Sequence, residues 1–129
     1  MKSTKSAIRY AKALLELSIE NSNLEEVSSD MKRIVDSSNE TNDFKVFLNS
    51  PVIKTDKKIE IMKVLFIGFE KLSMSFIELI TKNKREYLLI EIAEAYIYLL
   101  KKHQNIIFHE TVLFRIIPYF DITSSYISL

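Results

Sequence analysis

Histidine is the side chain whose ordinary pKa lies near neutral pH, and the chain has two, His103 and His109. They are six residues apart across an expected helix end, so they do not share a helix face, and with Glu110 they form only a weak metal-binding pattern. Glu91 and Glu94 are expected on the exposed face of a helix, where carboxylates add solubility. We therefore predict no catalytic residue and no metal ligand.

The composition excludes several kinds of site. The chain has 129 residues, no cysteine and one glycine, Gly68. Without cysteine there is no disulfide, no catalytic thiol and no cysteine-ligated metal. Loops that cradle phosphate groups need several glycines close together, so neither a dinucleotide fingerprint nor a P-loop can form. We accordingly expect no cofactor.

The charge is balanced overall but uneven along the chain. The formal net charge is +1, residues 1–15 carry four bases and no acid, and residues 16–43 carry eight acids and two bases. Such blocks are typical of solvated helix faces rather than of a nucleic-acid-binding surface. The longest apolar run, residues 64–69, is far shorter than the roughly 20 residues of a membrane span.

The first residues could imitate a targeting signal, because bases precede an apolar stretch. Glu16 interrupts that stretch, however, and no small-residue cleavage site follows it. We therefore expect the N-terminus to be part of the fold and the protein to stay in the compartment where it is made.

Helical spacing of apolar residues persists over the first hundred positions. We predict an all-α fold, a six-helix antiparallel bundle. Ser22 and Glu25 form a capping box that opens the second helix, Thr55 caps the fourth, and Asn83 suits the left-handed position after the fifth. The expected helices are residues 4–20, a segment from Ser22 to the polar stretch 37–42, and residues 43–48, 56–67, 71–82 and 85–103.

The character of the chain changes after residue 105. Residues 106–129 are rich in isoleucine, phenylalanine, tyrosine and threonine and contain Pro118. This composition predicts a short irregular or β-like C-terminal tail. We therefore divide the chain into a helical domain, residues 1–105, and a tail, residues 106–129.

Two of the expected helices carry more apolar surface than a single core contact needs. At about 100° per residue, the apolar positions of segment 4–20 cover an arc of roughly 240°, whereas docking on a core takes little over 100°. Segment 71–82 behaves in the same way. Either the other helices enclose these two, or the two border a groove that accepts a partner's amphipathic helix.

Four short motifs, in order along residues 5–104, resemble the delta subunit family of F-type ATP synthases, which includes the oligomycin sensitivity conferral protein. They are IRYAKALL at residues 8–15, LNSPVI at residues 48–53 with Lys57 and Lys58 after it, LITKNKR at residues 79–85, and the apolar segment 92–100.

This resemblance implies a six-helix N-terminal domain on top of the catalytic head, which binds the N-terminal helix of an alpha subunit against its first and fifth helices. The implied role is mechanical: a non-catalytic peripheral-stalk (stator) subunit that joins the head of the proton-translocating synthase to its stalk. Carried over onto this sequence, the partner contact falls on Tyr10, Ala13, Leu14, Leu17, Leu72, Phe76, Leu79 and Asn83.

Family members carry a second, partly β domain that engages the b subunits of the stalk, and residues 106–129 do not resemble it. The tail is expected to come from a truncated or frame-shifted reading frame or to be a genuine short variant, which leaves the b-subunit contact in doubt. The resemblance also implies a peripheral location on the cytoplasmic face of the bacterial inner membrane, with no membrane span of its own and no nucleic-acid partner.

A helix-turn-helix DNA reader is the alternative interpretation, formed by segments 56–67 and 71–82 around Gly68. Its recognition helix would offer Lys71 and Lys82 but also Glu78, with apolar residues where base-reading side chains should lie.

Overall fold

A computed structural model describes the backbone of residues 3–124 and the side chains of residues 3–106. This part of the chain is helical and contains no strand, which confirms the all-α fold class. The elements are α1 (Lys5–Glu20), α2 (Leu24–Glu40), α3 (Asp43–Asn49), α4 (Thr55–Leu65), α5 (Lys71–Lys82), the short 3-10 helix η1 (Glu86–Leu88) and α6 (Leu89–Ser124).

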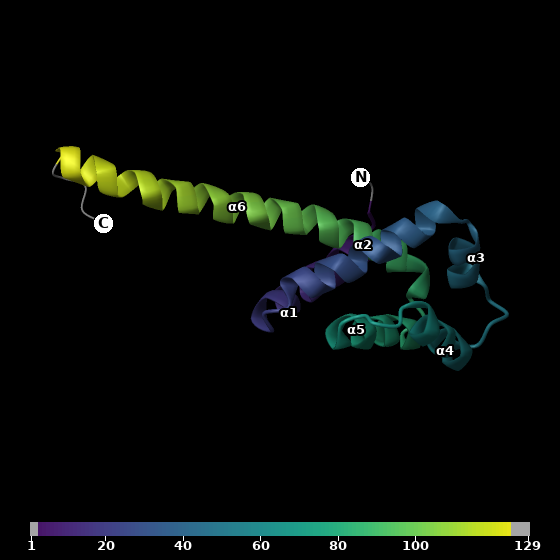
Figure 1. Ribbon diagram of the computed structural model, residues 1–129. Coiled ribbons are helices and arrows are strands. Elements are labelled where there is room, and N and C mark those ends of the chain that lie inside the picture. Colours follow the sequence, from purple (N-terminus) through teal and green to yellow (C-terminus); the bar gives the residue numbers. More distant parts are fainter. Residues whose placement is uncertain (1–2, 125–129) are drawn as a thin grey trace. The chain divides into compact units, whose positions relative to one another are not determined.

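The chain divides into two compact units, Met1–Leu99 and Leu100–Leu129. In the first unit, α1 and α2 run antiparallel as one hairpin, and α4 and α5 form a second (Figure 1). All six α helices contribute to its core, because apolar residues at helical spacing face the same interior. Its largest fully buried apolar side chains are Leu14, Met31, Ile34, Leu48, Met62, Ile77, Ile80, Leu89, Ile92 and Tyr96.

The second unit continues α6, which runs as a helix to Ser124. The prediction of an irregular or β-like tail over residues 106–129 was therefore wrong as far as the description reaches, and residues 125–129 lie outside it. Isoleucine, phenylalanine and tyrosine favour strands only where another strand is available for pairing. A helix satisfies its backbone hydrogen bonds internally, and these residues lower its stability by only about 0.5 kcal/mol each.

The turn between α1 and α2 differs from the predicted capping box. Thr4, expected as the first residue of the helix, is instead the N-cap of α1, since its Oγ1 accepts a hydrogen bond from the N–H of Ala7 at 3.1 Å. Ser22 instead takes the left-handed conformation, φ 56°, and its N–H donates to the carbonyl of Ile19 at 3.2 Å. Ser22 thus closes α1 rather than opening α2, and Asn23 becomes the N-cap of α2.

The end of α5 repeats this closure one residue later than predicted. Asn83 is the C-cap with φ −83°, and Lys84 takes the left-handed position with φ 60°. The N–H of Lys84 donates to the carbonyl of Thr81 at 2.9 Å, and the N–H of Arg85 donates to that of Ile80 at 2.7 Å. Both residues that close these helices carry a Cβ, which makes the conformation less favourable than it is for glycine.

Two charged side chains of α2 hold the connection between α4 and α5. Asp30 Oδ2 accepts a hydrogen bond of 2.9 Å from the N–H of Glu70, which is the N-cap of α5. Arg33 donates to the carbonyls of Ile67 and Leu65, at 3.3 and 3.5 Å, where α4 ends. An anion at a helix N-terminus and a cation at a helix C-terminus both oppose the local partial charge of the backbone. The two residues thus fix this connection on α2.

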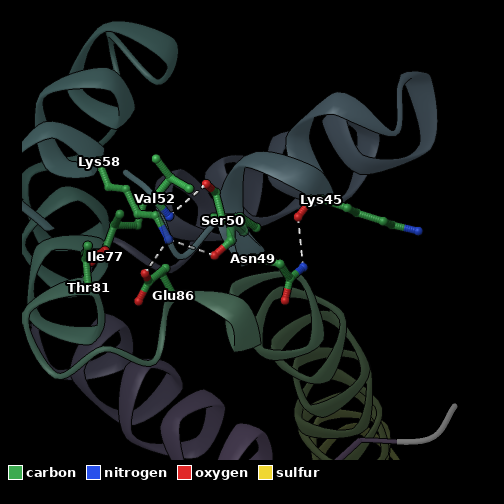
Figure 2. Close-up of polar contacts among 9 residues, drawn as sticks. Lys45, Asn49, Ser50, Val52, Lys58, Ile77, Thr81 and Glu86 are labelled. Atoms are coloured by element: carbon green, nitrogen blue, oxygen red, sulfur yellow. Dashed lines mark hydrogen bonds and ion pairs between the residues drawn. The ribbon is translucent and has the colours of Figure 1, made fainter. Parts of the chain in front are cut away.

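A buried lysine joins α4 to two further elements. Lys58 of α4 donates to Glu86 Oε2 of η1 at 2.7 Å and to the carbonyl of Leu48, in the last turn of α3, at 3.1 Å (Figure 2). The side chains of Lys58 and Glu86 are only 4% and 12% exposed. The prediction that Thr55 caps this helix was wrong by one position, because Lys54 is the N-cap and Thr55 is the first helical residue. The ion pair therefore fixes the corner where α5 leads into α6.

Replacing Lys58 with Met is expected to lower the free energy of unfolding by about 3–5 kcal/mol, because Glu86 would remain as a buried, uncompensated charge. The double variant Lys58→Met, Glu86→Leu should regain most of this loss. Urea denaturation measures both. Lys57→Met is the matched control, since Lys57 forms an exposed pair with Glu60 at 3.5 Å and its loss should change stability by less than about 1 kcal/mol. A double variant as unstable as the single one would contradict this account.

Lys84→Gly should raise the free energy of unfolding by about 0.5–1 kcal/mol, because glycine adopts a positive φ without steric cost. Lys82→Gly, in the last turn of the same helix, is the control and should lower it by a similar amount. Thermal and urea unfolding of the two variants should therefore shift in opposite directions. A shift in the same direction would show that Lys84 is not strained.

Candidate functional site

The predicted partner-binding residues lie on two neighbouring helices, α1 and α5. Tyr10 of α1 meets Phe76 of α5 edge to face, with ring centroids 6.1 Å apart and an interplanar angle of 77°. Such a pair is a favourable aromatic arrangement. The two helices therefore lie side by side at this contact.

The structure separates the eight predicted residues into two groups. Leu14 is fully buried and Phe76 is only 6% exposed, so both belong to the core beneath the surface. Leu17 and Leu79 are 41% and 52% exposed, although both are large and apolar. The six residues at the surface, here named the α1–α5 strip, are Tyr10, Ala13, Leu17, Leu72, Leu79 and Asn83.

The helical period explains why these positions stay uncovered. On α1 the buried residues are Ala7, Ala11, Leu14, Leu15 and Ser18, which share one face. Tyr10, Ala13 and Leu17 follow one another at spacings of three and four residues on an adjacent face. Leu72 and Leu79 lie seven residues apart on α5, and Asn83 follows one turn later. Helices α1 and α5 thus each present a second apolar face besides the one that forms the core.

Polar contacts fix α1 to α6 at both ends of α1. The N–H of Thr4 donates to Glu91 Oε1 at 3.3 Å, and the hydroxyls of Ser18 and Tyr96 share a hydrogen bond of 3.0 Å. Ser18 Oγ also donates to the carbonyl of Leu15 at 2.8 Å. Burial raises the pKa of Tyr96, the hydrogen bond to Ser18 opposes that effect, and the charge of Asp30 adds to it. The Tyr96 hydroxyl is therefore neutral at physiological pH.

Ion pairs and caps hold α5 in a similar way. Lys63 of α4 pairs with Glu78 of α5 at 2.9 Å, and Asp30 caps the start of the helix. The strip itself contains no charged side chain, but Glu16 and Glu20 of α1 and Lys82 of α5 are exposed on the same helices. This arrangement offers an apolar contact surface with charges nearby rather than a cleft with reactive groups.

A cavity of about 710 Å³ lies on another side of α1. Ile8 and Lys12 of α1 and Ala95 and Tyr98 of α6 are among its walls. By helical periodicity, Ile8 and Lys12 point away from Tyr10 and Leu17, so the cavity and the strip are different surfaces. Sequence reasoning did not predict this cavity. Ile8 was a usable signal, because it is an apolar residue of α1 that lies outside both the buried face and the strip.

The residues weighed for acid–base or metal chemistry do not form a site in the described part of the chain. Glu91 is half-buried by its contact with Thr4 rather than fully exposed as expected, whereas Glu94 is exposed. No group of three or more His, Asp or Glu side chains among the described residues is arranged to hold a metal ion. The side chains of His109 and Glu110 lie outside that description.

Over residues 3–124, no helix combines the length and the apolar character that crossing a bilayer requires.

Comparison with known proteins identifies relatives of this fold. The family model of the ATP synthase delta (OSCP) subunit matches residues 7–113. Proteins named ATP synthase subunit delta are 35% identical over 97 residues in Cytophaga hutchinsonii, 34% over 96 residues in Flavobacterium psychrophilum and 37% over 92 residues in Carboxydothermus hydrogenoformans.

These matches cover 71–74% of this chain and 52–54% of each relative. The chain therefore spans about half the length of the curated relatives it matches.

Substitutions test the division between strip and core. Leu17→Asp and Leu79→Asp should each lower the free energy of unfolding by less than about 1 kcal/mol, because both side chains are already substantially hydrated. Leu14→Asp should lower it by more than about 4 kcal/mol, because it buries a carboxylate without a partner. Thermal unfolding followed by circular dichroism separates these outcomes. Equal losses for Leu14 and Leu79 would show that the strip is part of the core.

Proposed function

The chain belongs to the ATP synthase delta (OSCP) subunit family, and on that basis we propose that it is a non-catalytic peripheral-stalk subunit of an F-type proton-translocating ATP synthase. In this role the α1–α5 strip binds the N-terminal helix of an alpha subunit. The chain then acts on the cytoplasmic face of the bacterial inner membrane, as a peripheral part of the synthase. The proposal concerns the matched half of the relatives and does not include a contact with the stalk's b subunits.

The observation that carries the proposal is the exposure of Leu17 and Leu79 on helices that are otherwise firmly held. Burying apolar surface contributes a favourable free energy of about 25 cal/mol for each Å² removed from water. Burial of the exposed strip by a partner is therefore favourable. An amphipathic helix matches it, because apolar residues spaced three and four apart cover one face of a helix.

The geometry suggests how each residue contributes. Ala13, which has only a methyl group, allows a partner backbone to approach between Tyr10 and Leu17. Leu79 supplies the exposed apolar contact on α5, and Tyr10 is supported from below by Phe76. Asn83 lies at the end of α5 and carries an amide that can hydrogen-bond a partner's polar group.

In a stator the subunit transmits force without chemistry. The catalytic head would turn with the rotating shaft unless the stalk held it, and a helix bound in the strip provides one point of attachment. The helix-turn-helix alternative would use the outward face of α5 to read DNA, but Leu72 and Leu79 on that helix cannot make the polar contacts that base edges require.

A synthetic peptide with the N-terminal sequence of the alpha subunit from the same organism tests this contact. Titration calorimetry should show one-to-one binding, with chemical-shift changes at Tyr10, Leu17 and Leu79. Leu17→Asp and Leu79→Asp should each weaken binding by about 2 kcal/mol, or roughly 30-fold, because they place a charge at an apolar contact.

Val64→Asp is the matched control, since Val64 is 76% exposed but lies outside the strip, on α4. It should leave the affinity unchanged. No heat and no chemical-shift change with the intact protein would refute the strip as the binding site, as would an equal loss of affinity in the Val64 variant. Salt-sensitive retention on heparin, with no binding of the peptide, would instead favour the DNA-binding alternative.

A further inference from the structure

A second apolar hollow lies between α2, α3 and α4, away from the α1–α5 strip. It has a volume of about 430 Å³. Its apolar lining comes from Phe44, Phe47, Ile61, Leu65 and Phe66. Phe44 and Phe66 are buried and meet edge to face with ring centroids 5.7 Å apart, so they form the floor of the hollow. Leu65 lies at its edge and is 46% exposed. We call this surface the α2–α4 groove.

Two carboxylates, those of Glu40 and Asp43, line the same groove. Both residues are exposed, and neither carboxylate forms an ion pair with any residue whose side chain the structure describes. The apolar lining thus meets two negative charges that no ion pair among these residues neutralises, although Asp43 lies in the first turn of α3, where the helix N-terminus favours a carboxylate.

The position of Glu40 makes its charge harder to explain by folding. Glu40 is the last residue of α2, and no basic residue lies in the last turn of that helix. A helix C-terminus carries a partial negative charge, so a carboxylate there is repelled. The acid lowers the stability of its own helix while adding negative charge to the groove.

We propose that the α2–α4 groove binds an amphipathic helix of a partner protein whose apolar side chains fill the groove and whose flanking Lys or Arg residues pair with Glu40 and Asp43. The buried aromatic floor favours apolar side chains, and the polar residues of the lining, Ser37, Glu40, Thr41 and Asp43, lie on α2, α3 and the connection between them. The acid-rich segment 16–43 adds a negative field that attracts a basic helix. This inference does not depend on the proposed function, because it concerns different helices and a different surface.

A synthetic peptide of leucine, alanine and lysine is the probe, with its leucines on one helical face and its lysines on the flanks. Its first control has the same composition in an order that spreads the leucines around the helix. Its second control replaces the lysines with glutamate. In NMR titrations of the whole chain, the probe should shift the signals of Phe47, Ile61 and Leu65, and both control peptides should bind at least about tenfold more weakly.

Charge-removing variants distinguish the effect of the two carboxylates on binding from their effect on the stability of the fold. Glu40→Gln combined with Asp43→Asn should weaken probe binding about tenfold, since two partly exposed pairs would be lost. Glu40→Gln alone should not lower the melting temperature, because it removes an unfavourable charge from a helix C-terminus. Glu25→Gln combined with Glu26→Gln, at the other end of α2, changes the net charge equally and should leave the affinity unchanged.

Equal weakening by both double variants would overturn the proposal, since it would reveal only general charge attraction. Shifts confined to Tyr10, Leu17 and Leu79 would overturn it as well, because the probe would then occupy the α1–α5 strip. Self-association in sedimentation that Leu65→Asp abolishes would assign the groove to a second copy of the chain instead. Leu79→Asp should leave probe binding intact, so the groove and the strip can fail independently.

Discussion

The buried cation of Lys58 is the contact on which the arrangement of the helices most depends. It joins α4, the last turn of α3 and η1 through one carbonyl and one carboxylate. Separating α4 from η1 would leave two charges without a partner in the interior, at a cost that marginal protein stability does not tolerate, and separating α3 would remove the carbonyl that the Lys58 ammonium also contacts. Since η1 follows α5 directly, this contact also limits where the end of α5 can lie, and Asp30 limits where that helix begins.

The exposed faces follow from how the helices are anchored. Ser18 and Tyr96 fix the last turn of α1, and Asp30 and Lys63 hold α5. Hydrogen bonds and ion pairs are directional, so they set the rotation of each helix about its axis more strictly than apolar packing alone would. With the rotation fixed, one apolar face of each helix enters the core and the other remains outside. The strip is thus a consequence of anchored helices that are apolar around more than half of their circumference.

Periodicity in the sequence was enough to predict most helices, because an amphipathic pattern reports the local period directly. The bounds of α5 agree with the prediction, and those of α1 differ by one residue. Periodicity could not predict that Ser22 and Lys84 take the left-handed conformation after α1 and α5, because neither residue is glycine or asparagine. Nor could it distinguish buried Leu14 from exposed Leu17, which share an apolar stripe on the helix. Nor could it predict the burial of Lys58 and Glu86, since nothing local indicates that partners from other helices surround them.

For the proposed role as a link under load, the placement of the polar contacts matters more than their number. A domain that transmits force yields first where a helix can slide or rotate against its neighbour, and apolar packing resists such sliding weakly because it has no preferred direction. The contacts of Lys58, Asp30 and Arg33 each join the end of one helix to the body or end of another. In the proposed role, a pull on α5 would be passed to α2 through Asp30 and to α4 through the Lys63–Glu78 pair, whereas a pull on α1 would be passed to α6 through the hydrogen bonds of Thr4 and Ser18.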